Sequence, residues 1–185
     1  MSALEWLAAA LVLLNVRLVV RRSLWNYPVA LAAVSLYGWV FFGARLYSDA
    51  LLQGFFFAIN LYGWWNWSRS RATSGEVAVG RLATPALAAW VAGCAVATGG
   101  WGWAMHRWTD AALPWWDAGV AMLSITAQLL QSRRRVENWL FWIAADAVAA
   151  PLYAARGLWV SAALYAILFV LAARGFVEWR RQAAA

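Results

Sequence analysis

The chain has 185 residues, of which 65% are hydrophobic and only 12% are charged. An average soluble domain is about 45–50% apolar and about 25% charged, so this composition argues against a soluble globular enzyme. A single cysteine, Cys94, and a single histidine, His106, exclude an internal disulfide and a metal site built from several such side chains. We therefore predict a polytopic membrane protein that holds no metal and no cofactor.

The net charge of +7 arises because the basic residues, all of them arginines, outnumber the acidic ones. The arginines form short clusters between apolar stretches and do not follow one face, a distribution typical of membrane proteins and not of nucleic-acid-binding proteins. The N-terminal residues lack a positively charged segment and a small-residue cleavage site, so we expect no signal peptide.

Seven apolar segments approach the roughly 20 residues that a transmembrane helix needs. The first is the weakest candidate, because Glu5 and Arg17 lie near its ends; if it lay flat on the membrane, six spans would remain. The longest polar connection runs from Ser68 to Pro85, and we expect it to be a linker loop. In chain order the predicted spans are 3–19, 27–44, 46–67, 86–104, 115–131, 137–154 and 157–175.

The arginines also predict the orientation. Twelve of them lie in the C-terminal tail or beside the connections that follow the first, third and fifth spans. Because positive charge gathers on the cytoplasmic side, we expect the N-terminus outside and the C-terminus in the cytoplasm. The three arginines on the opposite side are Arg45, Arg107 and Arg156.

The sequence partly matches itself at an offset of 112 residues, which aligns spans one to three with spans five to seven. The fourth span then links two parallel three-helix bundles, a 3+1+3 plan found in transporters that bind their substrate near the bilayer midplane. The predicted domains are a first bundle (1–71), a cytoplasmic loop with the linker helix (72–106), and a second bundle with a cytoplasmic tail (107–185). The matched pairs include Arg21-Arg22 with Arg133-Arg134, Asn26 with Asn138, Gly63 with Gly175, and Trp67 with Trp179.

One face of the third span combines amides with aromatic rings. The residues Gln53, Phe57, Asn60 and Trp64 follow the spacing i, i+4, i+7, i+11 of a single helical face. Amides at membrane depth need partners, and two alternatives remain open. They hydrogen-bond neighbouring helices, typically for about 0.6 kcal/mol per contact, or they bind a solute.

The sixth span has a similar face with Asn138, Trp142 and Asp146. Asp146 lies near the middle of its span, where an ionised carboxylate costs about 2.5–3.5 kcal/mol on insertion scales. It should face a wet cavity, pair with a cation or be protonated; as a structural alternative it hydrogen-bonds a tyrosine or a backbone amide of a neighbouring helix.

The tryptophans divide by depth. Most, including Trp116 and Trp179, lie near span ends, and we expect these at the headgroup level. Trp64 and Trp142 lie deeper and share faces with amides, so they are candidates for stacking on a flat, positively charged ligand.

The third and sixth spans carry three motifs, Gln53-x-x-Phe56, Tyr62-Gly63-Trp64-x-x-Trp67 and Glu137-Asn138-Trp139-x-x-Trp142, and the last continues through Asp146 to Pro151-Leu-Tyr153. Together these motifs resemble the PnuC family of bacterial nicotinamide riboside transporters. The resemblance implies the 3+1+3 fold, similar to that of the SWEET sugar transporters, and a homotrimer in the bacterial cytoplasmic (inner) membrane. It also implies facilitated diffusion of nicotinamide riboside into the cytoplasm for NAD synthesis, with trapping through phosphorylation by a separate kinase.

The resemblance further implies roles for single residues. Gln53 and Asn60 match the amides that hydrogen-bond the substrate. Asn138 and Trp142 match a second pair, with the indole against the pyridinium ring. The remaining candidates are Phe56 and Trp64, which are aromatic motif positions, Phe57, which follows from helical geometry, and Asp146, which could offset the positive charge of the substrate. Phe56 stands where many family members have tyrosine.

Other functions stay open as alternatives. Thiamine is also a planar cation with a hydroxyl group, so a thiamine transporter is the alternative within the family; riboflavin is larger and neutral and ranks third. A membrane-embedded enzyme would need clustered carboxylates or a histidine-based nucleophile, and the sequence has neither. Proton coupling through Asp146 is disfavoured against simple uniport, and a non-transporting scaffold would leave the amide and aromatic faces without a purpose.

Overall fold

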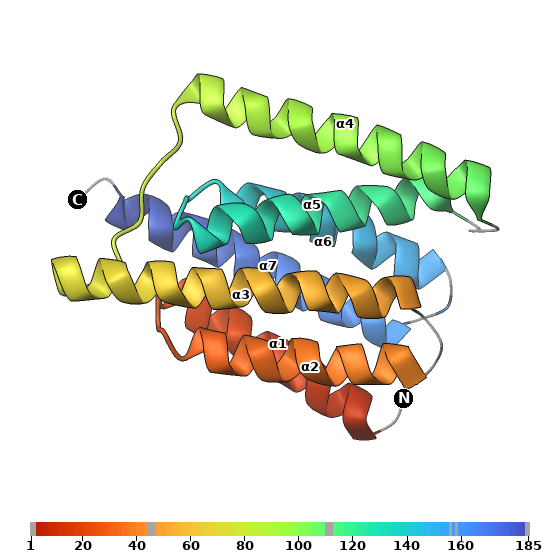
Figure 1. Cartoon of the computed structure of the whole chain (residues 1–185), viewed down its shortest axis with the longest axis horizontal. Helices are drawn as coiled ribbons and strands as arrows, with labels where there is room; N and C mark the ends of the chain where they lie inside the picture. The colour runs from red at the N-terminus through yellow and green to blue at the C-terminus, as the bar shows by residue number, and fades with distance from the viewer. Residues whose placement is uncertain (1–2, 44–46, 110–112, 156, 158, 184–185) are drawn as a thin grey trace. The chain divides into compact units, whose positions relative to one another are not determined.

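The computed structural model describes residues 3–43, 47–109, 113–155, 157 and 159–183, and its regular elements there are α-helices. Among these residues the one extended pairing is an isolated parallel bridge between Gly80 and Arg135. Figure 1 shows the helices, which are α1 (Ala3–Val20), α2 (Asn26–Gly43), α3 (Tyr47–Ser74), α4 (Thr84–Trp108), α5 (Pro114–Ser132), α6 (Asn138–Ala155) and α7 (Trp159–Gln182).

Among the described residues the predicted number of seven helices is confirmed, with one helix at each predicted span. Two of the three arginines assigned to the outer side, Arg45 and Arg156, lie outside the described residues.

The predicted linker loop from Ser68 to Pro85 is shorter than expected. The helix α3 continues to Ser74, because the residues after Trp67 are serine, threonine, arginine and alanine, which a helix accepts, and include no glycine or proline. It stops at Gly75, whose φ of 75° is left-handed and whose N–H donates to the Arg71 carbonyl at 2.9 Å. A glycine in this conformation is a common helix end. The connection to α4 is therefore limited to the residues between Ser74 and Thr84.

By length and composition alone, one helix among the described residues is suited to cross a membrane. The helix α7 reaches a mean hydropathy of 2.0, and only 17% of that stretch is buried within the protein. A shorter apolar stretch, Ala9–Val20, belongs to α1. That all seven helices cross a membrane stays a prediction from the sequence.

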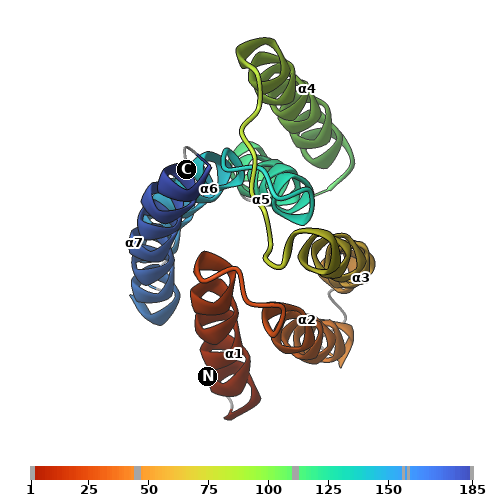
Figure 2. The same cartoon turned by 90° about the vertical axis from the view of Figure 1, so that its left-hand side faces the viewer.

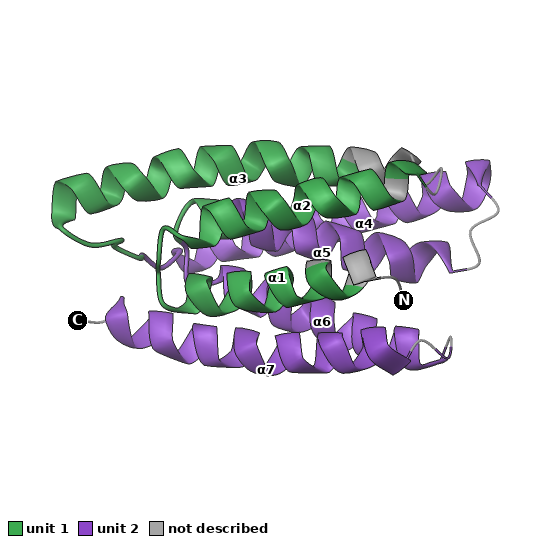
Figure 3. Cartoon of the chain, turned by 90° about the horizontal axis from the view of Figure 1, so that it is seen from below, with its two compact units in different colours: residues 1–79, 131–134 green, residues 80–130, 135–185 purple. Residues whose placement is uncertain are grey.

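The chain divides into two compact units, coloured in Figure 3. Unit 1 comprises residues 1–79 and 131–134, and unit 2 comprises residues 80–130 and 135–185. In unit 1, α2 packs against both α1 and α3, and Figure 2 shows α2 between its two neighbours.

Unit 2 contains the packed pair α6 and α7 and a hydrophobic core to which α4 and α5 contribute. That core has the buried residues Cys94, Ala127, Leu130 and Phe141 at its centre. Gly102 of α4 lets the indole of Trp115 in α5 approach closely, since a Cβ at this glycine would lie 2.5 Å from Cε3 of the indole.

The internal repeat is visible in the turns before α2 and α6. Arg22 and Arg134, which are matched at the offset of 112, have left-handed φ values of 53° and 59°. Each N–H donates to a carbonyl three residues back, Val19 or Gln131, at 2.9 Å. The residue after each arginine donates five residues back at 3.0 Å, which completes a helix end that usually employs glycine.

The two arginines hold the same loop through their side chains. Nη1 of Arg22 donates to the Val77 carbonyl at 2.8 Å, and Nη1 of Arg134 donates to the Ala78 carbonyl at 3.2 Å. Arg22 also pairs with Glu76 at 3.2 Å. These contacts within unit 1 fasten the chain that follows α3.

The aromatic packing repeats in the same register. Tyr27 lies against Gly63 in unit 1, and its matched residue Trp139 lies against Gly175 in unit 2. Tyr27 meets the ring of Trp67 edge to face at 5.3 Å, and Trp139 meets the ring of Trp179 edge to face at 5.4 Å. Trp179, which the sequence places at the headgroup level, does not expose its ring there, because its indole is fully buried against Trp139.

Candidate functional site

The eight predicted site residues are divided between the two units. Unit 1 holds Gln53, Phe56, Phe57, Asn60 and Trp64, all on α3, and unit 2 holds Asn138, Trp142 and Asp146, all on α6.

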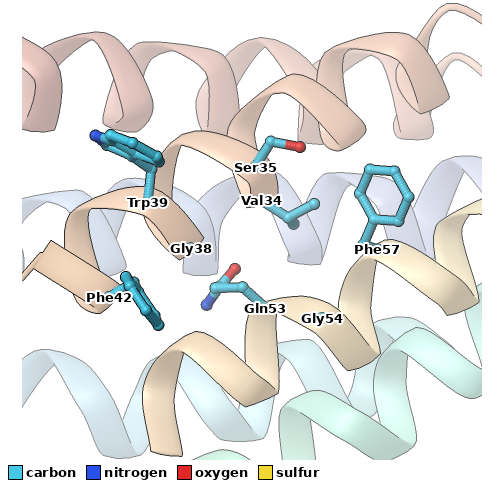
Figure 4. A pocket seen from close by; sticks show the side chains of 8 residues that line it. All are labelled: Val34, Ser35, Gly38, Trp39, Phe42, Gln53, Gly54 and Phe57. Atoms are coloured by element: carbon cyan, nitrogen blue, oxygen red, sulfur yellow. The ribbon is translucent and has the colours of Figure 1, made fainter. Parts of the chain in front are cut away.

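In unit 1, Gln53 and Phe57 line an open hollow of about 380 Å³ between α2 and α3. The two helices come close at Gly38 of α2, where an added Cβ would be in ordinary van der Waals contact, 3.5 Å, with Cβ of Gln53. Figure 4 shows the amide of Gln53 beside this glycine and the exposed ring of Phe42. The hollow thus brings one predicted amide and one predicted aromatic ring together. Its other lining residues are Val34, Ser35, Trp39 and Gly54.

Phe56 does not line this hollow; its half-buried ring meets Phe55 at 5.7 Å, tilted by 62°. Its carbonyl accepts a hydrogen bond from Nδ2 of Asn60 at 2.8 Å. Asn60 is only 4% exposed, and its amide is partly satisfied by its own helix.

Trp64 lies one turn beyond Asn60 and faces Tyr27 of α2. The two rings are nearly parallel, with centroids 6.4 Å apart and an angle of 7° between their planes. Trp64 is 37% exposed, whereas Tyr27 is fully buried and its hydroxyl has no hydrogen-bond partner among the described residues. Trp64 therefore presents one open surface and has its position set by a tyrosine beneath it.

In unit 2, Asn138 is fully buried at the first turn of α6, and its Nδ2 donates to the Arg135 carbonyl at 2.6 Å. The matched Asn26 donates to the Ser23 carbonyl at the same distance in unit 1. Both asparagines thus brace the turn before their helix. The Oδ1 atoms of both are buried, and neither has a partner within the described part of the chain.

Trp142 and Asp146 lie one and two turns further along α6. Trp142 is half-buried against the hydrophobic core of unit 2. Asp146 is only 4% exposed, and its carboxylate makes no hydrogen bond or ion pair with a described residue. Three or more histidine, cysteine, aspartate or glutamate side chains placed to hold a metal do not occur in the described part of the chain.

The sequence reasoning missed the contribution of α2. Ser35, Gly38, Trp39 and Phe42 line the hollow, and Tyr27 supports Trp64. The first four follow the spacing i, i+3, i+4, i+7 of one helical face, which is the signal that could have identified them.

The chain has the fold of a solved transporter. Its structure is similar to the crystal structure of the vitamin B3 transporter PnuC, with a TM-score of 0.79, 24% sequence identity, and coverage of 98% of this chain and 82% of that one. The two proteins thus share a helical fold.

Two curated relatives are also transporters. The nicotinamide riboside transporter PnuC of Escherichia coli (strain K12) is 32% identical, over 83% of this chain and 75% of the relative. The riboflavin/roseoflavin transporter RibM of Streptomyces davaonensis is 36% identical, over 90% of this chain and 79% of the relative. The family described as nicotinamide mononucleotide transporter matches residues 2–181, and the chain belongs to that family.

Proposed function

We propose that the protein transports nicotinamide riboside into the bacterial cytoplasm by facilitated diffusion and catalyses no reaction itself. A separate kinase would phosphorylate the riboside and so trap it for NAD synthesis. In this proposal the seven helices cross the cytoplasmic (inner) membrane in the 3+1+3 arrangement, with the N-terminus outside, the C-terminus in the cytoplasm, and three copies in the assembly. The family membership and the similarity to named vitamin transporters support this proposal.

The observation that favours a positively charged vitamin is the buried carboxylate of Asp146. It lies on the same side of α6 as Trp142 and has no partner among the described residues. A carboxylate in the membrane interior needs a compensating charge. A pyridinium ring would supply that charge, and an indole such as that of Trp142 attracts the same cation through its π face.

Riboflavin is the second candidate, because the relative RibM is 36% identical over 90% of this chain. It stands ahead of thiamine for this reason. Riboflavin is neutral and would leave Asp146 without a counter-charge, which is why nicotinamide riboside remains first.

The test is calorimetric titration of the purified protein with nicotinamide riboside, riboflavin and thiamine, followed by uptake into proteoliposomes. The proposal expects binding of the riboside alone and uptake that stops when the inner and outer concentrations are equal, without an ion gradient. Selective binding of riboflavin would instead identify the protein as a riboflavin transporter. Accumulation of the riboside driven by a proton gradient would overturn facilitated diffusion.

Replacement of Asp146 by asparagine separates the candidates most directly. Removing one partner of a buried charge pair costs about 2–5 kcal/mol, so we expect the dissociation constant for nicotinamide riboside to rise at least about tenfold. Binding of a neutral flavin should not change. Equal loss for both ligands, measured on folded protein, would contradict the role of Asp146 as a counter-charge.

The proposed binding residues are the eight named above, and Asn60 distinguishes binding from helix packing. We expect Asn60→Leu to fold and assemble like the unchanged protein while the affinity for the riboside falls several-fold, because leucine fills similar space but offers no hydrogen bond. Size-exclusion chromatography and calorimetry measure the two effects separately. Loss of the folded assembly instead would identify Asn60 as a packing residue.

A further inference from the structure

The C-terminal end of α7 borders a cavity that the transport proposal does not use. It has a volume of about 450 Å³ and lies within unit 2. The α7 residues on its wall occupy positions i, i+1, i+4 and i+5, which place them on one side of the helix. The lining residues are Arg81, Phe176, Val177, Arg180 and Arg181.

The positive charge of this cavity is incompletely compensated. Arg180 and Arg181 make no hydrogen bond or ion pair with any described residue. Arg81 has one acidic neighbour, Glu137, at 3.9 Å from Nε to Oε1. The other oxygen of Glu137 already accepts the backbone N–H of Leu82 at 3.0 Å, so this carboxylate is shared. A ligand with negative charge would find two unpaired guanidinium groups here.

The nearby carboxylate of α7 does not fill this role. Oε1 of Glu178 accepts a hydrogen bond from Nε2 of Gln182 at 2.7 Å, and Glu178 is not among the residues that line the cavity. The guanidinium groups of Arg180 and Arg181 therefore remain available to an external anion.

The rest of the wall is apolar. Phe176 is half-buried and Val177 is 47% exposed. They precede the two arginines by one turn on α7, which among the described residues is long and apolar enough to cross a membrane and whose apolar stretch is only 17% buried. The cavity thus changes from apolar to cationic along the axis of α7, as the edge of a bilayer changes from acyl chain to headgroup.

We propose that this cavity binds the phosphate of an anionic phospholipid, with the guanidinium groups of Arg180 and Arg181 on the phosphate oxygens and Phe176 and Val177 against the acyl chain. Arginine suits phosphate because its fork of N–H groups forms paired, charge-assisted hydrogen bonds. Basic pockets at the cytoplasmic ends of membrane helices favour such headgroups. The inference rests on the part of the proposed function that places the end of α7 at the cytoplasmic membrane surface.

The test is native mass spectrometry of the full chain in detergent with added phosphatidylglycerol or phosphatidylcholine. The expected result is selective retention of phosphatidylglycerol, and a loss of at least about fivefold in its apparent affinity in the double variant Arg180→Gln, Arg181→Gln. The matched control is Arg21→Gln, Arg71→Gln, which removes two exposed arginines outside the cavity and should retain the lipid.

Inorganic phosphate serves as the competing probe. A site that contacts both the headgroup and the acyl chain should keep its lipid when inorganic phosphate is added. The variant Val177→Ser should lower the affinity for the lipid without creating binding of phosphate. Displacement of the lipid by phosphate, or equal loss in the control variant, would overturn the proposal. Vitamin titrations on the same samples are independent of this result, so retention of the lipid without vitamin binding would overturn the proposed transport function alone.

Discussion

Replacement of Trp142 by alanine is expected to weaken binding of nicotinamide riboside about thirtyfold or more. A cation over an indole in a desolvated site is worth about 2 kcal/mol or more, and about 1.4 kcal/mol corresponds to a factor of ten in affinity. Trp142→Phe retains an aromatic face with a weaker attraction for cations, so its affinity should fall between those of the alanine variant and the unchanged protein. Calorimetry on monodisperse protein measures all three.

The control for this prediction must be a tryptophan outside the hydrophobic core. Trp116 is 54% exposed on α5 in the same unit, and Trp116→Ala should bind the riboside normally. Trp179 is unsuitable, because its fully buried ring packs against Trp139 and its removal would destabilise the fold. If the variants of Trp142 and Trp116 lose affinity equally, Trp142 does not contact the substrate.

Introduction of a single methyl group at Gly175 is expected to produce the largest change in stability. A Cβ at this position would lie 2.5 Å, 2.6 Å and 2.7 Å from three ring carbons of Trp139. The indole is buried and is also in edge-to-face contact with Trp179, so little room is left for it to move away. Overpacking of this kind typically costs about 1–3 kcal/mol, and Gly175→Ala should lower the apparent melting temperature clearly.

Gly93 provides the matched control, since it also lies within a helix, α4, and a Cβ there would meet nothing within 4 Å. Gly93→Ala should be neutral or stabilising by up to about 1 kcal/mol through its better helix propensity. Fluorescence-detected size-exclusion chromatography after heating compares the two variants. A normal melting temperature for Gly175→Ala would show that the α6–α7 contact tolerates a wider spacing.

The sequence predicted the local structure well where the apolar pattern is strong, and less well where contacts between helices determine the structure. The seven helices follow from the apolar spans, and the offset of 112 residues anticipated matching contacts for Asn26 and Asn138. The end of α3 was missed because the polar residues after Trp67 look like a loop although they are acceptable in a helix, and the helix ends at Gly75. Hydropathy alone could not show that Trp179 is buried, because an indole suits an interface and a core equally well.

The candidate site could also be predicted only in part, because some of its features depend on packing between helices. Burial of Asn60 and Asp146 follows from their place on apolar helices, and the structure has both nearly inaccessible. The brace formed by Asn138 was not predicted, since it depends on the left-handed turn that ends at Arg134. Tyr27 was missed because its position beneath Trp64 depends on contact between α2 and α3.

The two left-handed arginines have a consequence for the order in which the chain is completed during synthesis. Arg22 precedes the loop that it holds, so its bond to Val77 can form as soon as that loop leaves the ribosome. Arg134 is translated 56 residues after Ala78, so the second bond must wait until both α4 and α5 have been made. Until then only the first of the two arginines holds the residues that lead into α4, so the full set of contacts on this connection is completed late in synthesis.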